Sequence, residues 1–175
     1  MIDKALNYDY LTNYGKKELE FIMMYMHQKL EVQRVQFLGH LANILIIFMP
    51  PCEVFYVLRK LVHGSAAIKR KGEQGRLRWH VPLDADDQST LISSFMDLYL
   101  NLTESQKGER DIVHKCYSIN MNFDLLVHYM FNSLLTDIMP LDIAIPIAIN
   151  FLFEGVKVLF RYTIAAFALN RDFIL

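Results

Sequence analysis

Residues 33–48 read QRVQFLGHLANILIIF, and Pro50 and Pro51 follow directly after Met49. From Phe37 onward this stretch is almost continuously apolar, and the two prolines end it because proline cannot continue a helix. A bilayer-spanning helix needs about 20 apolar residues, so the stretch is too short to cross a membrane. It therefore predicts a buried core helix, and the same reasoning applies to residues 139–153.

Helical spacing of apolar residues continues on both sides of this stretch. We expect a capping residue at Thr12 or Asn13, a helix end just before Gly64, and an interruption near Asn120 that would divide the long segment in two. Sustained alternation typical of strands is not found. The sequence predicts one all-α domain over residues 1–175 with six to eight helices. These are expected at 15–30, 33–48, 52–63, 89–102, 111–136, 143–153 and 156–170.

One long polar loop is expected at about residues 65–88, and it carries the clearest local charge asymmetry. Its basic part could bind phosphoinositide headgroups, since each basic residue near an anionic membrane contributes about 1 kcal/mol. Alternatively, it is a solvated loop whose basic half is neutralised by its acidic half. Trp79 is interpreted as a core anchor. The basic residues are Lys69, Arg70, Lys71, Arg76 and Arg78, and the acidic ones are Asp84, Asp86 and Asp87.

Composition narrows the functional classes. The chain has 175 residues, 53% of them hydrophobic, and 18 basic against 19 acidic residues, which excludes disorder and gives no global attraction to nucleic acid. Cys52 and Cys116 form no CxxC pair, and the six histidines show no metal-ligand spacing and are interpreted as ordinary surface or half-buried side chains. Phosphate-binding, dinucleotide-binding, zinc-protease and serine-hydrolase motifs are absent, so we expect no metal, no cofactor and no self-contained enzyme. The N-terminus has no signal-peptide pattern, and we expect a cytoplasmic protein.

The C-terminal third contains the most specific motif. Met139-Pro140-Leu141 and the stretch FLFEGVKVLFR at residues 151–161 resemble the ending of the TBC domain family, all-helical activators of Rab-type GTPases. Residues 52–56 are similar to the mid-domain region of that family. Residues 7–13 resemble the subgroup in which a TBC domain is coupled to a TLD domain (the Skywalker-like subgroup). The IxxDxxR-bearing first half of the domain has no counterpart here, so the chain resembles a C-terminal portion.

The resemblance also implies which residues would act in GTP hydrolysis. Active family members supply an arginine from IxxDxxR and a glutamine from YxQ, which stabilise the transferred phosphoryl group and position the water. Aligned on Pro50, the YxQ position is occupied by Arg34-Val35-Gln36, which makes Gln36 the candidate glutamine finger and Arg34 a speculative arginine. A shift of two or three residues instead aligns Gly39 with the family glycine and places Leu38 at the finger position.

Three functions follow as expectations. The first is a TBC-like module that binds a Rab-family small GTPase in membrane traffic, with GTPase-activating activity weak or lost because IxxDxxR is missing. The second is a non-catalytic all-α structural or scaffold subunit of a larger assembly, because half a domain leaves apolar faces without cover. The third is a phosphoinositide-binding adaptor, peripheral to membranes, that uses Lys69 to Arg78.

Overall fold

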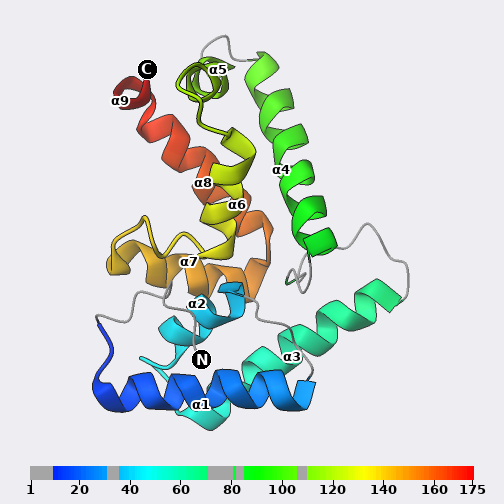
Figure 1. The fold of residues 1–175 in the computed structure, drawn as a ribbon, viewed down its shortest axis with the longest axis vertical. Helices are drawn as coiled ribbons and strands as arrows, with labels where there is room; N and C mark the ends of the chain where they lie inside the picture. The colour runs from blue at the N-terminus through cyan, green and yellow to red at the C-terminus, as the bar shows by residue number, and fades with distance from the viewer. Residues whose placement is uncertain (1–9, 31–35, 71–80, 82–84, 106–109) are drawn as a thin grey trace.

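The computed structural model describes residues 10–30, 36–70, 81, 85–105 and 110–175. Within these ranges the protein is all-α, with nine helices and no strand. The bounds are α1 (Asn13–Leu30), α2 (Gln36–Leu45), α3 (Pro51–Arg70), α4 (Ala85–Ser105), α5 (Arg110–Ser118), α6 (Phe123–Asn132), α7 (Leu141–Glu154), α8 (Lys157–Leu169) and α9 (Arg171–Ile174). Figure 1 shows α1 and α3 at one end of the molecule, α2 and α7 across its middle, and α4, α5, α6, α8 and α9 towards the other end.

Local capping explains several of these boundaries. Thr12 Oγ1 accepts a hydrogen bond from the backbone N–H of Gly15 at 3.1 Å, and this bond stabilises the first turn of α1. The predicted interruption near Asn120 is confirmed, because Asn120 has a φ of 57° and separates α5 from α6. Asn122 then caps α6, its Oδ1 accepting from the N–H of Leu125 at 3.2 Å. Asparagine suits both places because it tolerates the left-handed conformation and bonds free N–H groups.

The predicted polar loop at 65–88 is wrong at both of its ends. Helix α3 continues through Gly64 to Arg70, and α4 already begins at Ala85. A Cβ at Gly64 would meet nothing within 4 Å, so this half-buried glycine is an open position inside the helix and not a helix end. Glycine there costs about 1 kcal/mol relative to alanine, which the good helix formers that follow it can offset. Between the two helices the structure describes Val81, which is completely buried.

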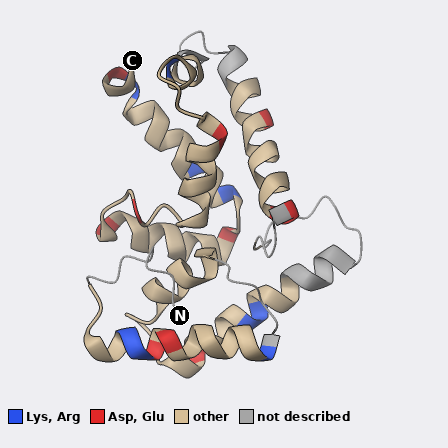
Figure 2. Cartoon of the chain, viewed as in Figure 1, with Lys and Arg blue, Asp and Glu red and all other residues tan. Residues whose placement is uncertain are grey.

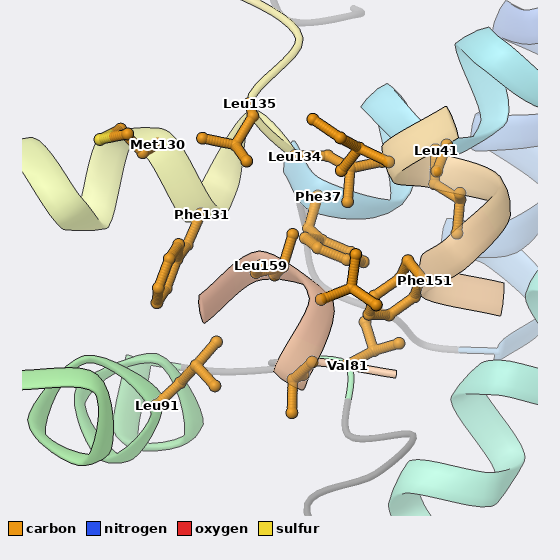
Figure 3. Packing of buried hydrophobic residues seen from close by; sticks show 14 of the residues in the cluster. Phe37, Leu41, Val81, Leu91, Met130, Phe131, Leu134, Leu135, Phe151 and Leu159 are labelled. Atoms are coloured by element: carbon orange, nitrogen blue, oxygen red, sulfur yellow. The ribbon is translucent and has the colours of Figure 1, made fainter. Parts of the chain in front are cut away.

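Helix α2 is shorter than predicted but more central. It ends at Leu45, a turn follows at 46–48, and Pro51 then occupies the first position of α3. All residues of α2 after Gln36 are buried, because α1, α3, α6 and α7 surround the helix. Figure 3 shows Phe37 and Leu41 from α2 beside Phe151 of α7, and the Phe37 and Phe151 rings meet edge to face at 4.9 Å.

Aromatic rings fill the other half of the core. Ring contacts between 5.1 and 5.8 Å join α4, α6 and α8 and involve Phe95, Tyr99, Phe123, Phe131, Phe160 and Phe167. Such pairs contribute about 0.5–1.5 kcal/mol each beyond the area they bury. The helices that carry these rings are thereby held in one arrangement, and α2 and α7 pack against the same apolar cluster.

Candidate functional site

Gln36, the candidate glutamine finger, is the first residue of α2 and is exposed. The nine residues that follow it are all buried, so the side chain projects from the end of a helix that is packed on every side. A group on a rigid element keeps its position better than one on a loop. The Gln36 side chain is therefore accessible to solvent, and the helix that carries it is held in place by packing.

The alternative alignment gives no usable finger. Leu38 and Gly39 both lie inside α2, and the Leu38 side chain is buried in the core. A buried leucine has no hydrogen-bonding group with which to orient a water molecule. Of the two alignments, only the one that places Gln36 at the finger position yields an accessible polar side chain.

Most of the other sequence-predicted site residues fall outside the described part of the chain. Arg34, Lys71, Arg76, Arg78 and Trp79 lie there. Lys69 and Arg70 form the end of α3 and are therefore helical rather than part of a loop.

The Glu154-Gly155 motif joins α7 to α8. Gly155 has φ 76° and ψ −156°, a combination that is essentially restricted to glycine, and its N–H donates to the carbonyl oxygen of Phe151 at 2.8 Å. The break expected between the helices at 143–153 and 156–170 is confirmed, because α7 ends at Glu154 and α8 begins at Lys157. Arg161 donates to Glu154, and Lys157 Nζ lies 3.8 Å from the same carboxylate oxygen. The motif thus has a structural role at this junction.

A cluster of buried and half-buried polar side chains lies one turn below Gln36. His40 and Asn43 of α2 are only 2% and 1% exposed. Thr136 Oγ1 lies 2.7 Å from His40 Nδ1, and Asp137 Oδ1 lies 3.8 Å from the same nitrogen. Asn43 Nδ2 donates to the hydroxyl oxygen of Tyr10 at 2.6 Å. These five residues, called the His40 cluster below, connect the segment before α1, helix α2 and the turn between α6 and α7.

The hydrogen bonds of the His40 cluster do not form a catalytic relay. Thr136 Oγ1 lies within hydrogen-bond distance of both the carbonyl oxygen of Ser133, at 2.6 Å, and His40 Nδ1, at 2.7 Å. Asp137 approaches that same nitrogen. In a hydrolase triad the nucleophile and the carboxylate bond opposite ring nitrogens. The cluster therefore fixes the position of α2 rather than activating a nucleophile.

Burial keeps the cluster's titratable rings neutral near pH 7. Desolvation lowers the pKa of His40, and the nearby Asp137 carboxylate partly offsets this effect. Desolvation also raises the pKa of Tyr10 to about 12, while the hydrogen bond from Asn43 acts in the opposite direction. The interpretation of His40 as a surface or half-buried histidine is wrong. The sequence did contain a sign that His40 is buried, because His40 and Asn43 lie inside an otherwise apolar run.

The turn that carries Thr136 and Asp137 has an unusual backbone. Leu134 and Leu135 both have positive φ, 51° and 62°, and both side chains are completely buried. The N–H of Leu135 donates to the carbonyl oxygen of Met130 at 2.8 Å, and that of Leu134 donates to Phe131 at 3.1 Å. This is the Schellman pattern, in which glycine normally occupies the position of Leu134. Burial of two leucines holds the turn in a conformation that leucine alone disfavours.

Among the described residues no group of histidine, cysteine, aspartate and glutamate could hold a metal ion, and no helix there is long and apolar enough to cross a membrane. Comparison of this chain with protein-family models, with curated proteins and with solved structures found no match.

Proposed function

We propose that this chain binds a Rab-family small GTPase through the surface around Gln36 and has weak or no GTPase-activating activity. The proposal rests on the motif at residues 151–161, which resembles the TBC domain ending, and on the YxQ alignment of Gln36. The observation that carries it is the exposed Gln36 at the head of a fully packed helix. Of the sequence-predicted site residues, Gln36 alone combines an alignment to a catalytic motif with a described, accessible side chain.

Weak activity follows from the missing arginine motif. An arginine finger contributes about 10³- to 10⁵-fold to turnover, and the sequence contains no IxxDxxR. Binding uses a broader surface than the two fingers, so it can persist when hydrolysis is slow.

The test separates binding from hydrolysis. Affinity for Rab GTPases loaded with a non-hydrolysable GTP analogue is measured for the wild type, for Gln36→Ala and for Gln28→Ala. Gln28 is an exposed glutamine on α1 and serves as the matched control. We expect Gln36→Ala to weaken binding by roughly 3- to 10-fold, the effect of one interfacial hydrogen bond, and Gln28→Ala to leave it unchanged.

Single-turnover GTP hydrolysis completes the test. We expect little acceleration by the wild type and none by Gln36→Ala. Absence of nucleotide-dependent binding to any member of a Rab panel would contradict the proposal. Equal weakening by both glutamine variants would show that the surface around Gln36 is not the binding site.

A second candidate function, a structural subunit of a larger assembly, is favoured by the C-terminal end of the molecule. Leu169 and Phe173 are 86% and 91% exposed, and Tyr117, Ile119 and Met121 are also exposed at the end of α5. Helix α9 contacts both α5 and α8, so these side chains belong to one region. Aromatic and methionine side chains are enriched at protein interfaces.

Sedimentation velocity over a range of concentrations tests this second function. If the region packs against protein, the isolated chain should self-associate, and Leu169→Ser with Phe173→Ser should abolish this association. Leu125→Ser changes a leucine of α6 that is 65% exposed and should have no effect. A wild-type chain that stays monomeric at every concentration would rule out self-assembly through this region.

A further inference from the structure

Helices α1 and α3 share an exposed aromatic surface. Phe21 and Tyr25 of α1 stack at 6.3 Å between ring centroids, and Tyr25 meets Phe55 of α3 edge to face at 5.0 Å. Phe21 is 62% exposed and Tyr56, next to Phe55, is 57% exposed. Three aromatic rings in contact thus run from one helix to the other; Phe21 and Tyr25 are exposed, and Phe55 is half-buried against the core.

Cationic side chains border these rings on α3. Lys60 Nζ lies 5.3 Å from the centre of the Tyr56 ring, and Arg59 stands one turn beyond Phe55. Both cations are exposed. Phe21, Tyr25, Tyr56, Arg59 and Lys60 are called the α1–α3 face below.

Charge is distributed unevenly between the two ends of the molecule. Among the residues whose side chains the structure describes, helices α1 to α3 contain five lysines and arginines against three glutamates. Counted in the same way, helices α4 to α9 contain four basic against seven acidic residues. Figure 2 shows both basic and acidic residues on α1, basic residues on α3, and acidic residues spread over α4, α6 and α7. An anionic surface would therefore attract the α1–α3 end and repel the other end.

We propose that the α1–α3 face docks on an anionic lipid bilayer. A bilayer surface offers uniform negative charge to the cations and a headgroup layer in which amphipathic aromatic rings are favoured. The two helices lie along one end of the molecule (Figure 1), so both can meet a flat surface together. The proposal goes beyond GTPase binding, which uses Gln36, and it places lipid contact on α1 and the first half of α3, a different site from the one expected at Lys69 to Arg78.

Co-sedimentation with vesicles tests the proposal. Vesicles of phosphatidylcholine alone are compared with vesicles that also contain phosphatidylserine. The test variant combines Arg59→Gln and Lys60→Gln. The control combines Lys115→Gln and Lys157→Gln, which removes the same net charge from α5 and α8 at the other end.

The wild type should bind the phosphatidylserine vesicles more tightly than the neutral ones, and added salt should weaken that binding. The Arg59 and Lys60 variant should bind about 30-fold more weakly, the loss expected from two cations at a membrane surface. The control pair should leave the affinity at its wild-type value.

Three results would overturn the proposal. The first is equal binding of the wild type to both vesicle types, or no binding to either. The second is an equal loss in both double variants, which would mean that net charge alone matters. The third is binding to a soluble glutamate polymer as tight as binding to vesicles, which would indicate an acidic protein partner instead.

Discussion

Because Leu134 has a left-handed backbone conformation, we expect its alanine and glycine variants to be about equally stable. At most buried positions in helices, glycine is more damaging than alanine. Leu134 has a φ of 51° and is completely buried, whereas Leu41 is equally buried inside α2. We therefore compare Leu134→Ala and Leu134→Gly with Leu41→Ala and Leu41→Gly.

The expected magnitudes come from three effects. Either leucine-to-alanine change should lower the free energy of unfolding by about 3–5 kcal/mol, because a buried side chain is lost. Changing alanine to glycine at Leu41 should cost roughly 1–2 kcal/mol more, through helix propensity and one further buried methyl group. At Leu134 the same step also removes a left-handed conformational penalty of about 1–2 kcal/mol, so the alanine and glycine variants should be nearly equal in stability.

Urea denaturation followed by far-ultraviolet circular dichroism measures all four variants. The quantity of interest is the alanine-to-glycine difference at Leu134 minus that at Leu41. The unfolded-state entropy of glycine and the loss of one methyl group are common to both positions and cancel. An identical alanine-to-glycine penalty at the two positions would refute the argument that the turn stores backbone strain.

Three further predictions concern the polar residues and the α7–α8 junction. Because the folded-state pKa of Tyr10 is raised to about 12, stability should fall as the pH rises above about 10, and urea titrations of Tyr10→Phe should show less of this fall. Because burial lowers the pKa of His40 in the folded protein, the unfolded chain binds a proton more readily at this residue. The free energy of unfolding should therefore fall as the pH drops below about 6.5, and His40→Gln should reduce this dependence of stability on pH. Gly155→Ala should lower the free energy of unfolding by about 1–3 kcal/mol because of its backbone angles, and an unchanged melting temperature would contradict that assignment.

Helix positions could be predicted largely from local patterns. The periodic segments, the interruption at Asn120 and the glycine junction at Gly155 each follow from residue types that act within one or two turns. Gly64 shows where this reasoning fails, because the same glycine signal occurs at a helix end and at an open interior position. Which of the two applies depends on the helix formers that follow and on the neighbouring elements.

Contacts between residues far apart in the chain could not be predicted from local sequence patterns. The bond between Thr136 and His40 joins residues 96 positions apart, and no local pattern relates them. Leu134 and Leu135 follow no turn rule, because tertiary packing of their side chains overrides the usual preference for glycine. Gln36 was found through the TBC resemblance, but its exposure at the head of α2 required the structure.

The complete enclosure of α2 has a consequence for synthesis on the ribosome. Residues 37–45 are covered in part by α6 and α7, which leave the ribosome almost a hundred residues later. Translation proceeds at about 5–20 residues per second, so about 5–20 s pass before the helices that pack against this apolar segment have been synthesised. A ten-residue helix is not stable alone in water, so during this interval the segment is a natural target for chaperones that hold nascent chains. The helix at the centre of the native protein is thus an apolar segment that lacks part of its packing partners while the protein is being made.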